Sequence, residues 1–129
     1  MDAPQKLRYT KSHEWVKWDG KIATVGITDF AQDQLSDLTY VELPTPGDSF
    51  SASEEVAVVE SVKAASDVYA PISGTITDVN KNLINKPELI NSDPYGAGWI
   101  FKLQPDDESE LESLLSFEEY ESLMPEDEG

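Results

Sequence analysis

The sequence contains no cysteine and a single histidine among its 129 residues. The absence of cysteine excludes a disulfide framework and a thiolate site. One histidine cannot build a zinc site, and the carboxylates lack the regular spacing of an EF-hand loop. No G-x-S-x-G motif supplies a nucleophile for His13 to activate. We therefore expect neither a metal site nor a catalytic residue.

Positive charge is also scarce. The chain has 9 Lys and Arg residues against 26 Asp and Glu residues, which gives a formal net charge of −17. Such a surface repels nucleic-acid phosphates and anionic lipids. We expect partners with basic protein surfaces rather than nucleic acid or membrane.

Long apolar runs are missing as well. No stretch approaches the roughly 20 residues that span a bilayer. The N-terminal segment has no apolar core typical of a secretory signal, and it is poor in the arginine and serine of a transit peptide. We expect a cytoplasmic protein of a bacterium, or a mitochondrial matrix protein if this is a mature eukaryotic chain.

The pattern that is present predicts one mainly β domain over residues 1–129. Short alternating segments separated by turns form a β body over 7–103, and Asp19-Gly20 marks a hairpin. One short helix over 28–35 interrupts this body, with Thr28 as its cap. Helical spacing and the pairs Asp107/Glu110 and Ser116/Glu119 predict short capped C-terminal helices over 107–124. Residues 125–129 form an acidic tail.

An internal repeat suggests how the β body is organised. The pattern V-x-x-P-x-x-G occurs at 41–47 and again at 68–74. Two copies are too few for a solenoid, which needs at least three. They indicate two similar halves, each with a strand that ends in a turn. We expect positive φ angles at the two turn glycines, Gly47 and Gly74.

Lys63 occupies an unusual place for a residue type that is rare in this chain. In "VVESVKAASDVYAPISG" (58–74) it lies in a turn of small residues between two apolar strands. A hairpin tip supported by core strands is rigid and protruding, so its amine is accessible to another protein. Acylation of that amine would remove its charge and leave a long flexible arm. An ordinary exposed turn lysine is the simpler alternative.

This stretch closely resembles the attachment segment of lipoyl-bearing domains. An acidic residue, a small residue, valine, lysine and alanine precede V-x-x-P-x-x-G, so Glu60, Ser61, Val62 and Ala64 would be read by the attaching enzyme. Biotin carriers share the hairpin but flank their lysine with methionines, which Val62 and Ala64 are not. Lipoyl domains of 2-oxoacid dehydrogenases have an aspartate where this chain has Val62.

Four further stretches resemble H proteins of the glycine cleavage system. They are "KSHEWV" (11–16), "VGITDFAQDQLSDLTYVELPTPG" (25–47), "ITDVNKNLINKPELIN" (76–91) and "NSDPYGAGWIFKL" (91–103). The resemblance extends over nearly the whole chain. It implies a lipoyl/biotinyl-like fold, a flattened barrel-sandwich hybrid of two similar halves with one short internal helix and short C-terminal helices.

The resemblance also implies a function. Lys63 would carry lipoic acid in amide linkage, placed there by lipoylating enzymes. The arm would shuttle an aminomethyl group from a pyridoxal-phosphate glycine decarboxylase to a tetrahydrofolate-dependent aminomethyltransferase, and electrons to dihydrolipoyl dehydrogenase. The protein would be a non-catalytic carrier and a monomer. Ser12, Glu14 and Asp67 would line a cleft that holds the cationic arm.

Two other classes stay open on the residues alone. A biotin carrier would use the same hairpin. A binding module would present the acidic surface and carry no cofactor.

Overall fold

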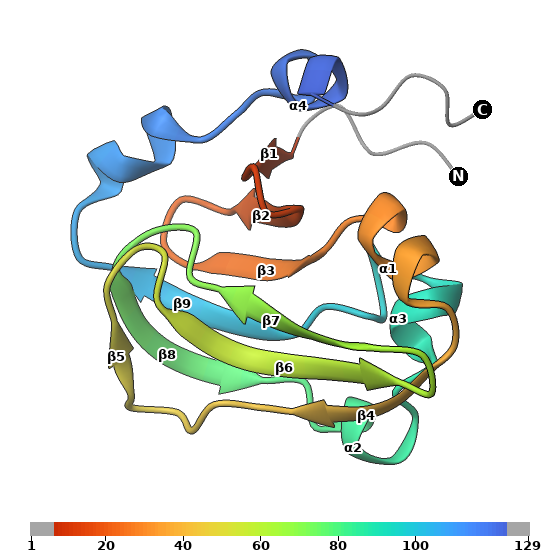
Figure 1. The fold of residues 1–129 in the computed structure, drawn as a ribbon. Helices are drawn as coiled ribbons and strands as arrows, with labels where there is room; N and C mark the ends of the chain where they lie inside the picture. Colours follow the sequence, from red (N-terminus) through yellow and green to blue (C-terminus); the bar gives the residue numbers. More distant parts are fainter. Residues whose placement is uncertain (1–6, 124–129) are drawn as a thin grey trace.

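The computed structural model describes residues 7–123, and its strands form two sheets rather than one closed barrel (Figure 1). The larger sheet has the order β1-β2-β3-β9-β8-β5 and the smaller has the order β4-β6-β7. The larger sheet consists of β1 (Arg8–Tyr9), β2 (Glu14–Trp18), β3 (Ala23–Ile27), β9 (Phe101–Pro105), β8 (Gly74–Val79) and β5 (Ser49–Phe50). The smaller consists of β4 (Leu38–Glu42), β6 (Glu55–Ser61) and β7 (Ala65–Tyr69).

Five short helices complete the described chain: α1 (Asp29–Leu35), α2 (Asn82–Asn85), α3 (Leu89–Ser92), the 3-10 helix η1 (Glu108–Ser113) and α4 (Phe117–Leu123). The mainly β class with few short helices is therefore confirmed, but two four-residue helices, α2 and α3, accompany the single internal helix that was predicted. No helix within residues 7–123 is long and apolar enough to cross a membrane.

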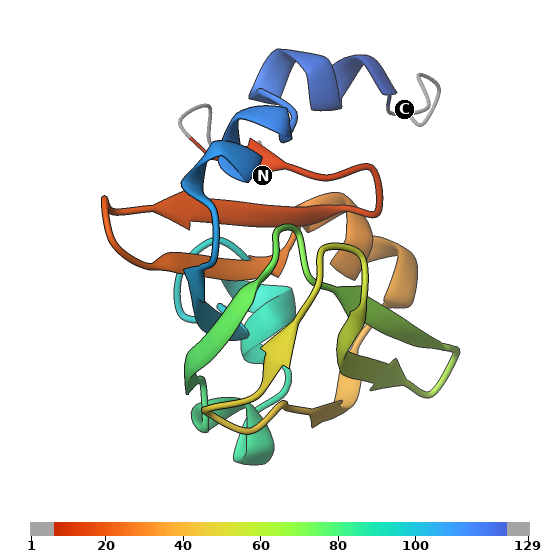
Figure 2. The ribbon, with the colours of Figure 1, turned by 90° about the vertical axis from the view of Figure 1, so that its left-hand side faces the viewer.

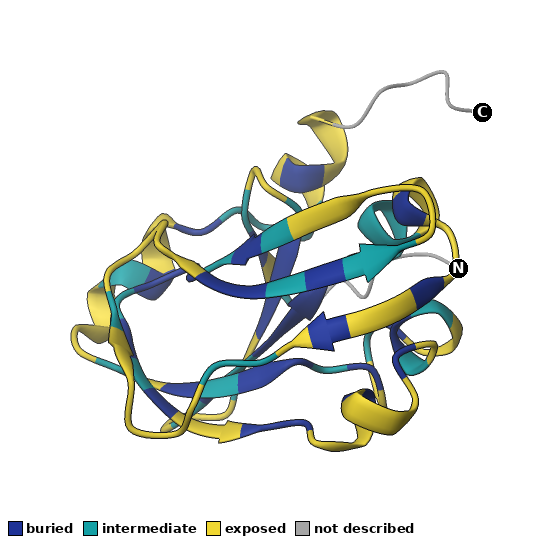
Figure 3. Cartoon of the chain, turned by 60° about the horizontal axis from the view of Figure 1, so that its bottom comes forward, coloured by how far each residue is buried: buried dark blue, intermediate teal, exposed yellow. Residues whose placement is uncertain are grey.

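The core lies between the two sheets. Side chains alternate between the two faces of a strand, so every second residue of the smaller sheet points inward. Val41, Val59 and Val68 are buried there, while Tyr40 and Glu42 on the opposite face are exposed (Figure 3). This arrangement leaves one face of the three-stranded sheet in solvent.

The predicted hairpin at Asp19-Gly20 joins β2 to β3. The Asp19 carboxylate accepts hydrogen bonds from the backbone N–H groups of Lys21 and Ile22, both at 2.8 Å, and Gly20 has a φ of 100°. In this register Trp15 lies opposite Gly26. A Cβ atom at position 26 would come within 2.7 Å of the indole ring, so only glycine admits the tryptophan.

The predicted internal helix is α1. Thr28 caps it, because its hydroxyl oxygen accepts a hydrogen bond from the N–H of Ala31 at 3.3 Å. The helix leads into β4 and lies next to α3.

The two predicted capping pairs have different outcomes. Ser116 and Glu119 form the reciprocal box at the start of α4, with bonds of 2.9 and 3.2 Å. Asp107 does cap η1, through the N–H of Ser109. Glu110, however, accepts a hydrogen bond from the N–H of Ser73 at 2.7 Å, because η1 lies against the turn before β8. That pair is therefore not the predicted box.

The two copies of the repeat meet at β5 and β8, which pair just after each copy. Gly47 has the expected positive φ of 100°. Gly74 does not, and the prediction there was wrong. A Cβ atom at Gly74 would collide with the carbonyl oxygen of Gln104 on β9, so the glycine is needed for close strand packing.

The C-terminal helices run over the β1–β2 hairpin (Figure 2). The contact includes a β-bridge between Tyr9 and Leu115, whose backbone groups exchange two hydrogen bonds of 2.8 Å. The predicted acidic tail, 125–129, and Met124 at the end of the predicted helical region lie outside the described residues.

Candidate functional site

Lys63 lies in the turn between β6 and β7, at the right-hand side of Figure 1. The last cross-strand pairs before the turn are Val59 with Ser66 and Glu60 with Ala65. The Lys63 side chain is exposed, and within residues 7–123 its ammonium has no hydrogen-bond or ion-pair partner. The amine is therefore accessible at a defined point of the fold.

Ser61 organises this turn. Its hydroxyl oxygen accepts hydrogen bonds from the N–H groups of Lys63 and Ala64, both at 3.1 Å. Its own N–H donates to the carbonyl oxygen of Ala64 at 2.8 Å. Sequence reasoning assigned Ser61 to enzyme recognition, and the structure adds that it holds the backbone of the turn.

The other residues flanking Lys63 differ in exposure. Val62 is 90% exposed. Ala64 is exposed too, whereas Glu60 is half-buried on β6. Val62, Lys63 and Ala64 are therefore all accessible at the surface of the turn.

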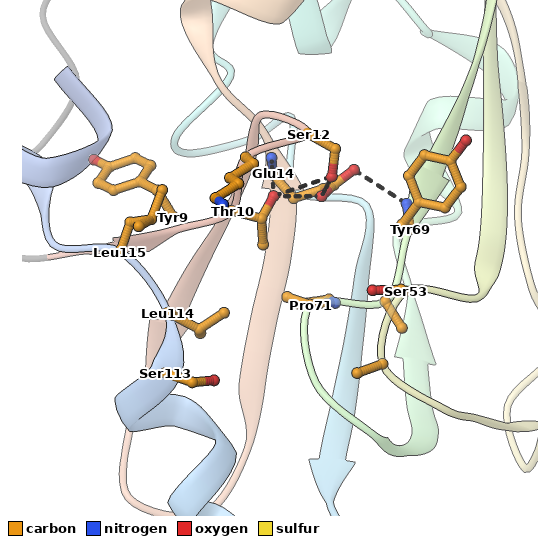
Figure 4. Close-up of a pocket in the computed structure, with 13 residues that line it drawn as sticks. Tyr9, Thr10, Ser12, Glu14, Ser53, Tyr69, Pro71, Ser113, Leu114 and Leu115 are labelled. Atoms are coloured by element: carbon orange, nitrogen blue, oxygen red, sulfur yellow. Dashed lines mark hydrogen bonds between the residues drawn. The ribbon is translucent and has the colours of Figure 1, made fainter. Parts of the chain in front are cut away.

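Glu14, at the start of β2, is only 1% exposed. One carboxylate oxygen accepts hydrogen bonds from the hydroxyls of Thr10 and Ser12, both at 2.5 Å. The other accepts from the N–H of Tyr69 at 3.1 Å (Figure 4). A tight turn over 10–14 brings the two hydroxyls to the carboxylate. Among residues 7–123, the donors to this buried carboxylate are all neutral.

These surroundings act on the protonation of Glu14 in opposite directions. Burial raises its pKa, because the charged form loses water. The hydrogen bonds from Ser12, Thr10 and Tyr69 lower it, since they stabilise the carboxylate. Burial is the larger effect, so the pKa of Glu14 lies above its ordinary value.

Glu14 borders a cleft of about 600 Å³. One wall is the C-terminal segment at Ser113 and Leu114, and the other includes Ser53 and Pro71 (Figure 4). The cleft thus lies between the C-terminal helices and the end of β7.

A second, smaller hollow of about 220 Å³ lies towards the hairpin tip. Asp67 and Ser66 of β7 line it together with Ser12 and His13. Its apolar lining comes from β3, α1 and β6, namely Ile27, Phe30, Ala31, Leu35 and Val59. Of the three predicted cleft residues, Ser12 borders both spaces, Glu14 only the larger and Asp67 only the smaller.

Sequence reasoning missed Thr10 and the backbone N–H of Tyr69 as partners of Glu14. Thr10, Ser12 and Glu14 lie in a tight turn rather than along a strand, so no strand or helix period indicates that their side chains meet. The Tyr69 contact joins residues 55 positions apart and gives no local pattern.

Two packed sheets that present a hairpin with an exposed lysine place this chain among the barrel-sandwich hybrid domains, the class that includes lipoyl and biotinyl carriers. A crystal structure of a glycine cleavage system H protein from Mycobacterium marinum matches the fold with a TM-score of 0.83. It is 39% identical, and the match covers 93% of this chain and 97% of that one.

The particular family follows from the sequence comparisons. The family model described as "Glycine cleavage H-protein" matches residues 7–127. The glycine cleavage system H protein of Carboxydothermus hydrogenoformans is 52% identical over 96% of this chain and 95% of its own length. That of Halothermothrix orenii is 50% identical over 98% of each chain. The chain belongs to the glycine cleavage H-protein family, and this membership supports a lipoyl-carrier role in the glycine cleavage system.

Proposed function

We propose that the protein carries lipoic acid in amide linkage on Lys63. The observation that supports this most directly is the exposed amine at the tip of the β6–β7 hairpin, which has no partner within residues 7–123. Ser61 holds the turn in one shape, and Val62 and Ala64 leave the amine unshielded. We assign Glu60, Ser61, Val62 and Ala64 to the surface that lipoylating enzymes read.

The protein is then a non-catalytic carrier. Lipoic acid, once attached, supplies a cyclic disulfide that can take up an aminomethyl group and two electrons. The carrier serves glycine decarboxylase, the tetrahydrofolate-dependent aminomethyltransferase and dihydrolipoyl dehydrogenase. A monomer fits this sequence of encounters, and the bacterial relatives fit a cytoplasmic location.

The smaller hollow suits the arm. Its apolar lining matches the hydrocarbon part of a lipoyl-lysine side chain, and Asp67 supplies a carboxylate for a cationic load. Val59 of β6 and its cross-strand partner Ser66 of β7 both line the hollow, and the turn that carries Lys63 joins these two strands. The long lipoyl-lysine arm can therefore fold back from the turn towards the hollow.

Glu14 orients the hydroxyl of Ser12 so that its oxygen can accept a hydrogen bond from this cationic load. The Ser12 hydroxyl donates its hydrogen to the Glu14 carboxylate, so its oxygen lone pairs are left to accept from an ammonium group. The buried negative charge behind Ser12 adds electrostatic attraction, which is strong where water is excluded. In this arrangement Asp67 and Ser12 line the hollow, and Glu14 acts on the load through Ser12 from the side of the larger cleft.

Intact mass measurement tests the attachment. The protein is expressed in cells supplied with lipoate and mapped by peptide mass spectrometry. A lipoyl increment on Lys63 is expected, whereas a biotinyl increment would indicate a biotin carrier. The Lys63→Arg variant should gain no increment and support no glycine cleavage in a reconstituted assay.

The matched control is Lys81→Arg, because Lys81 is exposed and lies outside the hairpin. It should be lipoylated and active like the wild type. Full glycine cleavage by Lys63→Arg would overturn the proposal.

A further inference from the structure

The hydroxyl of Tyr120 connects three elements behind the smaller hollow. It lies 2.8 Å from Nδ1 of His13 in the β1–β2 turn and 2.8 Å from Oγ1 of Thr28, the cap of α1. Tyr120 itself is 3% exposed and belongs to α4. A single buried group therefore links the C-terminal helix to two of the segments that form the hollow.

His13 is directly part of the hollow's lining. Its backbone has a φ of 73°, in the left-handed region that non-glycine residues seldom adopt, and its ring packs on Phe30 with centroids 4.8 Å apart. A residue in such a conformation persists only where its surroundings fix it. The contacts that fix it here include the Tyr120 hydroxyl and the bond from the Thr28 N–H to the His13 carbonyl oxygen.

We propose that Tyr120 is a positioning residue for the docked arm: its hydroxyl fixes His13 and Thr28 and thereby the wall of the hollow and the adjacent Ser12. This role rests on the proposed docking of the arm in the smaller hollow. Tyr120 touches neither the arm nor its load, since it does not line the hollow.

The hydroxyl and the ring of Tyr120 have separable tasks. The ring stacks on Tyr9, with centroids 4.8 Å apart and planes inclined by 15°, and this packing anchors α4. Burial raises the pKa of Tyr120 to about 12, so the hydroxyl keeps its proton at neutral pH and can serve both partners. The Tyr120→Phe substitution keeps the stacking and removes only the link to His13 and Thr28.

The first measurement follows the His13 ring by 15N NMR. His13 is the only histidine, so its two ring nitrogens are assigned without ambiguity. Tyr120→Phe should shift the Nδ1 resonance, because that nitrogen loses its partner. Tyr40→Phe, which alters an exposed tyrosine, should leave the resonance in place. An unchanged resonance in Tyr120→Phe would overturn the proposal.

The second measurement follows the load. Lipoylated protein is charged by glycine decarboxylase and isolated, and hydrolysis of the aminomethyl group to formaldehyde and ammonia is timed well below the unfolding temperature. Loss of the hydroxyl should shorten the lifetime about two- to tenfold, the range expected for one hydrogen bond. Tyr40→Phe should match the wild type.

The two proposals fail in different ways. If folded wild-type carrier loses its load as fast as urea-unfolded carrier, docking itself is wrong and the positioning role falls with it. If the wild type protects and Tyr120→Phe protects equally, only the positioning role is overturned.

Substitution of Thr28 provides an independent variant should Tyr120→Phe fail to fold. Thr28→Val removes the other hydrogen bond of the hydroxyl together with the cap of α1, whereas Thr28→Ser keeps both, so the His13 Nδ1 resonance is recorded beside the lifetime. We expect a shortened lifetime in Thr28→Val and restoration in Thr28→Ser. Equal lifetimes in these two variants would overturn the proposal.

Discussion

At the scale of single residues, Glu14 is costly for the fold. A carboxylate that is 1% exposed loses most of its hydration, and only neutral donors replace that water. Burying a charge in this way is unfavourable unless hydrogen bonds compensate. Such a buried charge attracts a cation near it, which is the property that the proposed arm site requires.

The Glu14→Ala substitution should shorten the lifetime of the loaded carrier, because Ser12 loses its orientation and the site loses its charge. Glu42→Ala, an exposed glutamate on β4, is the control. The comparison uses the hydrolysis assay on lipoylated protein. Equal lifetimes in wild type and Glu14→Ala would remove Glu14 from the arm site.

Glu14 should also make the lifetime of the loaded carrier depend on pH. Docking of a cationic load needs ionised Glu14, and burial raises the pKa of Glu14 above its ordinary value. Protection should therefore be lost as the pH falls through this raised pKa, at a milder acidity than an exposed carboxylate would give. Two measurements test this: the lifetime of the loaded carrier as a function of pH, and a 13C titration of the Glu14 carboxyl. If Glu14→Ala shows the same dependence of lifetime on pH as the wild type, the prediction is contradicted.

Ser61 offers a third test at this scale. Ser61→Ala removes the oxygen that accepts from Lys63 and Ala64, so the turn becomes less ordered while the lysine remains. A loss of about 1 kcal/mol in turn stability would lower the rate of lipoylation about fivefold. Steady-state lipoylation assays measure this, with Ser49→Ala, an exposed serine on β5 of the other sheet, as control. If Ser61→Ala is lipoylated at the wild-type rate, the turn takes its shape only when the lipoylating enzyme binds, and Ser61 does not preorganise it.

At the scale of elements, α4 depends on its first turn. Ser116 and Glu119 each satisfy a backbone N–H of the other. Ser116→Ala should cost about 1 kcal/mol locally, and the amides of α4 should exchange with solvent faster. Ser122→Ala, near the end of the same helix, is the control. Residue-resolved hydrogen exchange measures this effect. If the α4 amides of Ser116→Ala exchange at the wild-type rate, tertiary packing alone holds the helix.

Strand register is decided partly by local pattern and partly by contact. The Asp19-Gly20 turn and the alternating residues around it predict the β2–β3 hairpin, and that prediction is confirmed. Glu110 shows the limit of such reasoning, because its partner is Ser73, on a turn 37 residues away. A capping pattern cannot reveal that a closer donor arrives from another part of the chain.

At the scale of the whole molecule, the formal net charge of −17 opposes folding through self-repulsion. Added salt screens this repulsion, since the Debye length falls from about 10 Å at 0.1 M to about 3 Å at 1 M. We expect the thermal unfolding midpoint to rise by several degrees between these concentrations. Calorimetry in sodium chloride and in a second 1:1 salt separates screening from specific ion effects. A midpoint that stays constant in both salts would contradict the expectation.

The sequence by itself determined the mainly β class, the Asp19-Gly20 hairpin, the position of Lys63 in a turn of small residues, and the family resemblance that the comparisons confirm. These features can be inferred from the spacing of neighbouring residues and from long stretches of sequence similarity. Only the tertiary structure decided that Glu14 is buried against Tyr69, that Asp67 and Glu14 face different spaces, and that Tyr120 reaches His13. Those contacts join residues far apart in the chain, and their geometry exists only once the two sheets and the C-terminal helices have packed.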